Sequence, residues 1–486
     1  MIILFSINHW NRPKITITRT KKSPAVDIFI TVVNEPLDLL ERVIKSAKEI
    51  NYTKKKVYVL DDGKREEVAQ LANKHLAEYL VRPNRPQDYK AGNLNFGLGE
   101  SKAPLILTLD ADQVVIDPNI LNDLVGYFDN VEVALVSTHQ SFDVPASDFN
   151  HDLMFYKAMQ IGKNYSNSAI SVGSGSIYRR TALEIVGGFP TWSVVEDMYV
   201  SYLLHQAGYK SQYVDKPYTM GTAPIRLPDI AKQRGTWALD SMRVLLRDCP
   251  LFKKKLSINQ RLQYFEIGYI YLVSALCLPI LFILPSISIL FNFTLINNPL
   301  EYLILRGPSL ALAIYTYYLL NGKSFSASQY WSSLSFVYLR SFVLALKKQK
   351  PKYTVTAKIP GNNYGLHYTY PHLAILTISS LVIINQAFTV GPTLMLASQV
   401  FWTGLSLLWF YPWILKGFGS GDYKKSTIWP TPTPTAMANP PINNISNPWE
   451  IIPKPDSLAL NTPNMNNAIS ETRIDSGRAF PTENIR

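Results

Sequence analysis

The chain has 486 residues, 47% of them hydrophobic and 17% charged, and this length allows two or three domains. Its formal net charge is +12, which favours either anionic partners or a membrane protein with a basic cytosolic face. The sequence has no dense Arg/Lys tract with interleaved aromatic residues, so we expect no nucleic-acid partner. Its two cysteines, Cys249 and Cys277, have neither a disulfide framework's pattern nor the spacing of a Cys/His metal site.

The first part of the chain alternates strand-like and helix-like segments. Residues 26–33 form a β-branched run, and an amphipathic pattern follows over 37–50. Further apolar runs lie at 57–60, 105–109 and 133–137. This rhythm predicts a parallel α/β sheet.

Acidic or amide side chains follow three of these predicted strands. The runs end at Asn34-Glu35-Pro36, Asp61-Asp62-Gly63 and Asp110-Ala111-Asp112. In open α/β sheets, ligands bind outside the carboxyl ends of the strands. We therefore predict a charged site at this edge of the sheet, although a single Asp-Gly ending would indicate only a turn.

The second part of the chain contains long apolar runs. Four of them, at about 266–290, 303–320, 371–388 and 394–415, approach the roughly 20 residues that a membrane-spanning helix needs. Segment 326–346 carries apolar residues at helical spacing, interrupted by serines, and we predict an interfacial helix there. A fifth span at 326–346 is the alternative.

The charges of the loops favour four spans. Lysines cluster before the first run, between the second and third, and after the last, whereas 291–301 and 389–393 carry no Lys or Arg. The positive-inside rule then places the α/β domain, the middle segment and the tail in the cytosol. From about 420 the chain is rich in Pro and Asn and has too few apolar residues to fold, so we expect disorder.

The paired carboxylates of Asp110 and Asp112 suit a divalent cation. Mg²⁺ and Mn²⁺ favour oxygen ligands, and such a cation can bridge a diphosphate. An Asp-x-Asp pair alone is more often a solvated turn. Asp61 and Asp62 close an earlier strand, where an acid can accept hydrogen bonds from a base or ribose, or simply form a turn.

Two further groups lie closer to the membrane half. Glu196-Asp197 precedes a helical stretch, so a carboxylate there can act as a general base or cap the helix. Gln233 and Trp237 are four residues apart and share a helix face, where an indole and an amide can hold a sugar ring. An interfacial Trp is the structural alternative.

The order Asp-Asp-Gly, Asp-x-Asp, Glu-Asp, Gln-x-x-x-Trp resembles the processive inverting family-2 glycosyltransferases, most closely the cellulose synthase branch. Supporting segments are Lys90-Ala91-Gly92-Asn93-Leu94-Asn95 and Gly173-Ser174-Gly175-Ser176. The segment from Tyr353 to Lys358 resembles the family's gating loop, with Tyr where Phe is usual. The similarity extends from about 26 to about 416.

The resemblance implies a fold and a set of roles. The fold would be a glycosyltransferase-A-type α/β domain with a mixed, mainly parallel sheet, followed by a helical transmembrane domain. The implied site residues are Asp197 and Glu196 for catalysis; Glu35, Asp61, Asp62, Lys90, Asp110 and Asp112 for the nucleotide sugar; Asp110 and Asp112 for Mg²⁺ or Mn²⁺; Gln233, Arg234 and Trp237 for the acceptor; and Thr356 and Lys358 in the gating loop. The implied partners are a UDP-sugar, a growing glycan, the lipid bilayer and accessory secretion subunits.

One departure from the family pattern affects the functional interpretation. The residue before Trp237 is Thr236, where the family usually has an Arg that contacts the diphosphate. Val195 also stands where a Thr is usual, and we expect this change to matter little. A processive synthase of a β-linked glucan, using UDP-glucose, is our first hypothesis. A non-processive transferase acting on a lipid or short glycan is the second, and an inactive homologue is the third.

We therefore expect four segments in the chain. They are an N-terminal lead over 1–25, a cytosolic glycosyltransferase domain over 26–260, a membrane domain over 261–418 with about four spans, and a disordered tail over 419–486. The protein is expected to be a multi-pass protein of the plasma or inner membrane.

Overall fold

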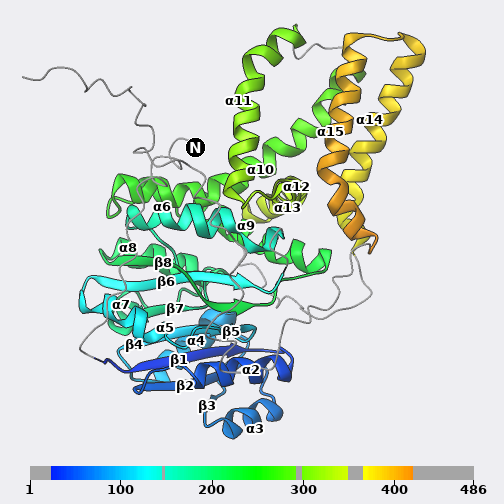
Figure 1. Cartoon of the computed structure of the whole chain (residues 1–486). Helices are drawn as coiled ribbons and strands as arrows, with labels where there is room; N and C mark the ends of the chain where they lie inside the picture. The colour runs from blue at the N-terminus through cyan, green and yellow to red at the C-terminus, as the bar shows by residue number, and fades with distance from the viewer. Residues whose placement is uncertain (1–22, 145–147, 292–297, 348–364, 420–486) are drawn as a thin grey trace, which may run out of the picture. The chain divides into compact units, whose positions relative to one another are not determined.

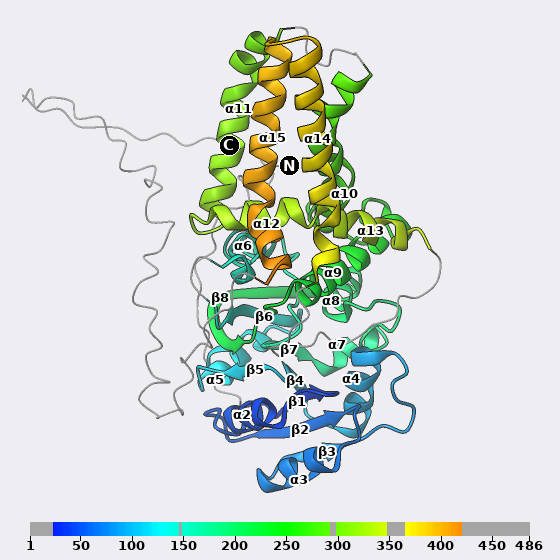
Figure 2. The ribbon, with the colours of Figure 1, turned by 90° about the vertical axis from the view of Figure 1, so that its right-hand side faces the viewer.

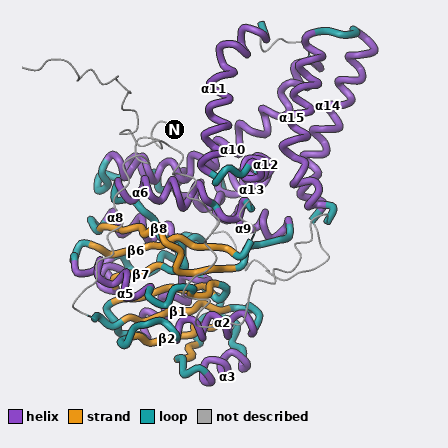
Figure 3. Tube along the Cα trace, in the orientation of Figure 1, coloured by secondary structure: helices purple, strands orange, loops and turns teal. Residues whose placement is uncertain are grey.

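The computed structural model describes residues 23–144, 148–291, 298–347 and 365–419. Within these residues, eight strands form one sheet in the order β3-β2-β1-β4-β7-β6-β8-β5 (Figures 1 and 3). The strands are β1 (Val26–Val32), β2 (Lys55–Asp61), β3 (Glu78–Leu80), β4 (Leu105–Asp110), β5 (Gln113–Val115), β6 (Val133–Phe142), β7 (Ser176–Arg179) and β8 (Lys210–Gly221).

The sheet is mixed and mainly parallel. Strands β3, β2, β1 and β4 pair in parallel, and so do β6 and β8. The antiparallel pairs are β4 with β7, β6 with β7, and β5 with β8. The predicted fold class is therefore confirmed for this domain.

Both faces of the sheet are buried, which explains the continuous apolar runs of the parallel strands. Ile28, Ile30 and Val32 of β1 point into one apolar cluster, whereas Phe29 points into a second cluster. This alternation follows from the period of two along a strand.

The helices of the domain that contains the sheet are α2 (Leu37–Lys48), α3 (Glu66–Lys74), α4 (Tyr89–Glu100), α5 (Ile120–Leu124), α6 (Gln160–Tyr165), α7 (Arg180–Ile185), α8 (Glu196–Gln206) and α9 (Leu227–Arg247), with 3₁₀ turns at Val125–Asp129, Phe149–His151 and Pro250–Phe252 and a π-helix at Met154–Met159.

The later helices are longer and more apolar. They are α10 (Ile258–Leu290), α11 (Pro299–Leu320), α12 (Phe325–Ser333), α13 (Ser335–Ala345), α14 (Tyr370–Thr389) and α15 (Leu394–Gly417), with a 3₁₀ turn at Leu366–Thr369 before α14 (Figure 2). In the described part of the chain, three helical segments are long and apolar enough to cross a membrane: Ile258–Leu290, Leu366–Thr389 and Leu394–Gly417. The run at 303–320 falls in α11, which is not among these three. The expectation of four spans stays a prediction.

The segment 326–346 forms two helices where we expected one. Helix α12 ends at Ser333, and α13 begins at Ser335. At this break, Nε2 of the buried His372 of α14 lies 2.9 Å from the carbonyl oxygen of Ser333. Whether these helices lie at the membrane interface stays a prediction.

Polar side chains join three of the apolar helices. Ser286 of α10 lies 2.7 Å, oxygen to oxygen, from Ser379 of α14, and it accepts a 2.8 Å hydrogen bond from Gln399 of α15. All three side chains are buried. Hydrogen bonds of this kind associate helices in an apolar environment, where burial of apolar area contributes little.

Candidate functional site

The parallel register brings acidic strand ends to one edge of the sheet. Val32, the last residue of β1, pairs with Asp61, the last residue of β2. Its neighbour Thr31 pairs with Asp110, the last residue of β4. Asp61 and Asp110 therefore flank β1 at its carboxyl end, which is where α/β sheets bind ligands.

Asp61 and Glu35 use their carboxylates within local turns. Asp61 is fully buried and accepts hydrogen bonds from the backbone N–H groups of Gly63 and Arg65, each at 2.8 Å. Oε2 of Glu35 accepts the backbone N–H of Val33 at 2.7 Å. Asp61 also accepts a 3.0 Å hydrogen bond from the Tyr79 hydroxyl, so its carboxylate joins the local turn to β3.

Asp62 has a different partner. The guanidinium of Arg82 donates Nε to Oδ1 of Asp62 and Nη2 to Oδ2, each at 2.7 Å. Both side chains are almost fully buried. The motifs in the sequence gave no indication of Arg82, because a lone Arg after a short strand has no distinctive spacing.

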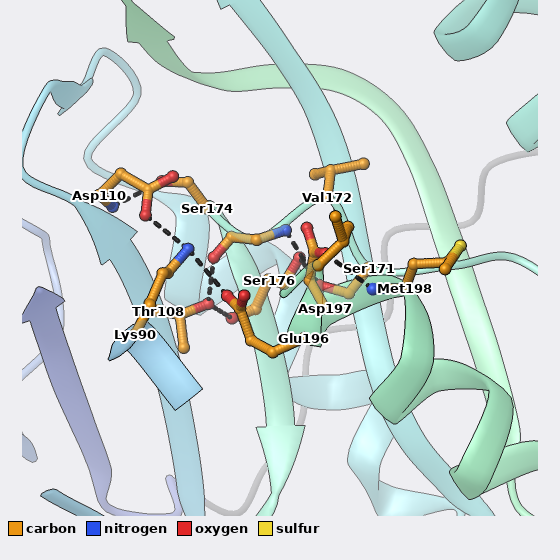
Figure 4. A network of polar contacts seen from close by, with 12 residues as sticks. Lys90, Thr108, Asp110, Ser171, Val172, Ser174, Ser176, Glu196, Asp197 and Met198 are labelled. Atoms are coloured by element: carbon orange, nitrogen blue, oxygen red, sulfur yellow. Dashed lines mark hydrogen bonds and ion pairs between the residues drawn. The ribbon is translucent and has the colours of Figure 1, made fainter. Parts of the chain in front are cut away.

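Lys90 connects the two ends of the predicted site. It lies in the first turn of α4, and its Nζ is 2.7 Å from Oδ1 of Asp110 and 3.1 Å from Oε1 of Glu196 (Figure 4). Burial alone lowers the pKa of Lys90, but the carboxylates of Asp110, Glu196 and Asp197 outweigh it and raise that pKa well above its ordinary value. Lys90 is therefore a permanent cation between the two acidic groups.

Asp197 lies in the first turn of α8 and is half-buried. Val195, and not Asp197, is the N-cap residue of this helix, and Oδ1 of Asp197 accepts the backbone N–H of Met198 at 2.8 Å. Burial, followed by the neighbouring charge of Glu196, raises the pKa of Asp197 to about 7, against the opposing effect of Lys90. A carboxylate with such a pKa is suited to take a proton near neutral pH.

The segment from Ser171 to Ser176 connects Asp110 to Asp197. Ser174 Oγ accepts the backbone N–H of Asp110 at 3.1 Å, and Thr108 donates its hydroxyl to the carbonyl of Gly173 at 2.8 Å (Figure 4). At Gly173, where φ is +84°, a Cβ atom would lie 2.8 Å from Oδ2 of Asp197 and 3.3 Å from Nζ of Lys90. The glycine is therefore needed for this close approach. The sequence motif located the segment but not these contacts.

Asp112 lies two residues beyond Asp110 and is buried, and its Oδ2 accepts the Thr222 hydroxyl at 3.4 Å. Among the described residues, no group of three or more His, Cys, Asp or Glu side chains could hold a metal by itself. Mg²⁺ is often bound through only one or two carboxylates together with substrate phosphates. The donor set of Asp110 and Asp112 therefore fits a cation that arrives with a diphosphate.

The predicted acceptor residues lie on α9. Gln233 and Trp237 are both half-buried, whereas Arg234 is buried and donates Nη1 to Oδ1 of Asp152 at 2.6 Å. The Arg234 guanidinium also lies 4.9 Å from the centre of the Trp237 ring. Thr236 donates its hydroxyl to the Lys232 carbonyl of the same helix. The predicted gating-loop residues Thr356 and Lys358 lie outside the described residues.

Comparisons with known proteins show what the chain is similar to. Residues 27–187 match the family model described as Glycosyl transferase family 2, and residues 184–337 match the one described as Cellulose synthase. Among solved structures, a mannosyltransferase from Pyrobaculum calidifontis, in complex with GDP-Man and Mn²⁺, has a TM-score of 0.54 at 18% identity and covers 71% of this chain and 94% of its own. The likeness to the mannosyltransferase concerns the fold alone.

Several curated relatives are cellulose synthases. Cellulose synthase 1 of Komagataeibacter xylinus is 27% identical over 447 residues, covering 86% of this chain and 28% of that protein. A UDP-forming cellulose synthase 1 catalytic subunit of the same organism is 27% identical over 389 residues, covering 75% and 51%. The UDP-forming catalytic subunit of Xanthomonas axonopodis pv. citri is 30% identical over 254 residues, covering 50% and 35%.

The sheet and its acidic edge define a glycosyltransferase of the A type. Residues 27–187 are similar to glycosyl transferase family 2, and residues 184–337 are similar to the cellulose synthase family. The two matches together indicate a hexosyltransferase. The chain spans between 28% and 51% of the length of these three relatives, so its own reaction is a matter for proposal.

Proposed function

We propose that the protein transfers glucose from UDP-glucose to the non-reducing end of a growing β-linked glucan, with inversion at the anomeric carbon. The observation that carries this proposal is the placement of Asp197. Its carboxylate lies against Gly173 and beside Lys90, which pairs with Asp110. The proposed base and the proposed diphosphate-binding carboxylate therefore both lie near the ammonium of Lys90. The UDP-forming cellulose synthases among the relatives support the donor and the polymer.

The chemistry can be written from this chain's own groups. A hydroxyl of the acceptor attacks the anomeric carbon of the donor, and Asp197 takes its proton. The new carbon–oxygen bond forms as the bond to the diphosphate breaks, and UDP leaves with the electron pair. Attack from the side opposite the diphosphate inverts the anomeric centre. Lys90, held as a cation, stabilises the negative charge that develops on the leaving group.

Asp110 and Asp112 are the residues that would hold Mg²⁺, or Mn²⁺. Their carboxylate oxygens suit either cation. A mannosyltransferase of similar fold was solved with GDP-Man and Mn²⁺, which supports dependence on a divalent cation. When bound, the cation supplies further charge stabilisation for the diphosphate.

We further propose a multi-pass membrane protein of the plasma or inner membrane, with the catalytic domain and the tail in the cytosol. The three long apolar helices support association with a bilayer. The expected secretion of the polymer through these helices, and accessory secretion subunits, belong to the same proposal. The number of spans is proposed from the loop charges alone.

A non-processive transfer to a lipid or short glycan is the second candidate. Thr236 favours it, because the cationic side chain that the family usually places there is absent and its hydroxyl is bound within α9. A transferase that adds one sugar does not need to hold a long product between transfers.

Product analysis tests both candidates. The protein, in nanodiscs with Mg²⁺, is supplied in turn with UDP-glucose and other UDP-hexoses, and the product is measured for linkage and length. We expect UDP-glucose to be preferred and a β-linked glucan of many residues to form. A single added sugar would contradict processivity, and no UDP release from any donor would contradict the proposed function.

A further inference from the structure

The buried guanidinium of Arg82 joins two parts of the proposed donor site. Arg82 follows β3, and its side chain is 1% exposed. Two of its nitrogens donate to the two carboxylate oxygens of Asp62 at 2.7 Å. This bidentate arrangement uses the planar fork of the guanidinium, which a lysine ammonium cannot reproduce.

The same guanidinium holds the turn that precedes Lys90. Nη1 donates to the carbonyl of Gln87, and Nη2 donates to the carbonyl of Tyr89 at 3.0 Å. Within this turn, Asp88 and Tyr89 have φ values of +60° and +50°. Two consecutive non-glycine residues in the left-handed region are unfavourable and persist only where the surroundings hold them.

Gly92 leaves room for this arrangement. A Cβ atom at Gly92 would lie 2.5 Å from the Gln87 carbonyl oxygen and would also meet the Arg82 guanidinium. By contrast, a Cβ atom at Gly99 of the same helix, α4, would meet nothing within 4 Å. The glycine of the Lys90-Ala91-Gly92 segment is therefore required by the close approach of both the guanidinium and the Gln87–Asp88 turn that it holds.

We propose that Arg82 is a positioning residue, which fixes Lys90 by holding the strained Asp88–Tyr89 turn against Asp62. Lys90 is the next residue along the chain, and its ammonium reaches Asp110 and Glu196. A shift of this turn moves the ammonium away from both carboxylates. The expected effect on KM rests on the proposed function, whereas the contacts of Arg82 do not depend on it. Asp62 then contributes to the donor site through Arg82.

Arg82→Lys is the direct test, with Arg180→Lys as its matched control. Arg180 is also buried, and it also pairs with an aspartate, Asp27, and with backbone carbonyls, but it lies at the opposite end of β4. We expect both variants to lose thermal stability. Only Arg82→Lys should raise the KM for UDP-glucose, by about 10- to 100-fold, since small misplacements of a binding group have effects of this size. Equal KM values in the two variants would overturn the proposal.

A second readout does not depend on turnover. Hydrogen–deuterium exchange followed by mass spectrometry reports the backbone of residues 86–92 in the full-length protein. We expect faster exchange there in Arg82→Lys and no change there in Arg180→Lys. If wild-type protein released no UDP, the proposed function would fail, and the exchange rates would still decide the role of Arg82. Unchanged exchange in Arg82→Lys would overturn it.

The glycine pair supplies a variant that keeps the guanidinium. Gly92→Ala should raise the KM for UDP-glucose in the same way as Arg82→Lys, because the new methyl group pushes on both the guanidinium and the Gln87 carbonyl that it binds. Gly99→Ala should leave the KM unchanged and stabilise α4 slightly, as alanine usually does in a helix. A Gly92→Ala protein with wild-type KM would contradict the proposed coupling.

Discussion

Gly173 and Asp197 lie so close together that a Cβ atom on Gly173 would be 2.8 Å from the Asp197 carboxylate. Because residue 173 is a glycine, the carboxylate can approach the segment 171–176 closely. Ser174 of the same segment accepts the backbone N–H of Asp110. This contact sets the space between the proposed base and the proposed diphosphate site. A larger residue at 173 must displace one of them.

Gly173→Ala is therefore expected to abolish most turnover. Gly187→Ala is the matched control, since Gly187 also has a positive φ, +86°, but a Cβ atom there would meet nothing within 4 Å. Each variant should lose about 1–2 kcal/mol of stability from its backbone conformation. Only Gly173→Ala should reduce kcat, by about 100-fold. Equal kcat values in the two variants would contradict the assignment of Asp197.

Asp197→Asn should increase the stability of the protein at pH 8 and abolish its activity. Because burial and Glu196 raise the pKa of Asp197 to about 7, the folded protein binds a proton more tightly there than the unfolded chain does. The fold therefore loses stability as the pH rises from about 4 to 7. We expect the amide variant to melt at a higher temperature than wild type at pH 8, and to release no UDP. A lower melting temperature at pH 8 would contradict the raised pKa.

The pH dependence of kcat/KM provides a separate check on the base. Asp197 must be ionised to accept a proton, so kcat/KM should rise with pH through a limb near 7. Lys90→Met removes the cation that lowers the pKa of Asp197. In that variant the limb should move to higher pH, even though the absolute rate falls. A limb below pH 5 in the wild-type protein would exclude Asp197 as the group that titrates.

Thr236→Arg tests the departure from the family pattern. The new guanidinium would lie beside Trp237 on α9, where the family usually has one that contacts the diphosphate. We expect kcat for UDP release to rise, because the leaving group gains a cation. Thr236→Gln is the control for side-chain length without charge. No increase over the glutamine variant would mean that another group already fills this role.

Much of the sheet could be predicted from the sequence. Residues 26–33, 57–60 and 105–109 were predicted as strands, and the structure has β1, β2 and β4 there. Buried parallel strands are continuous apolar runs, so they stand out. Strand β8 was not predicted, because its Lys, Asp and Pro residues interrupt any apolar pattern.

The sequence could indicate which acidic residues follow strands, but not what each carboxylate contacts. Asp61 and Asp62 are neighbours in one motif, yet the first binds turn amides and the second binds Arg82. This difference depends on a side chain 20 residues further along the chain. Likewise, His372 contacts the carbonyl of Ser333 at the junction of α12 and α13 although it is distant in sequence. Contacts of this kind leave no periodic signal.

Asp110, Lys90 and Asp197 are proposed to form one metal-dependent site for sugar transfer. The most direct test is UDP release from UDP-glucose by the protein in nanodiscs, with Mg²⁺ and then with excess EDTA, for wild type, Asp110→Asn and the control Asp248→Asn. Asp248 is also partly buried but contacts Tyr199 and Lys253 outside this site. We predict Mg²⁺-dependent release by wild type and Asp248→Asn, and none by Asp110→Asn. Undiminished release by Asp110→Asn, or release that EDTA does not affect, would contradict the account.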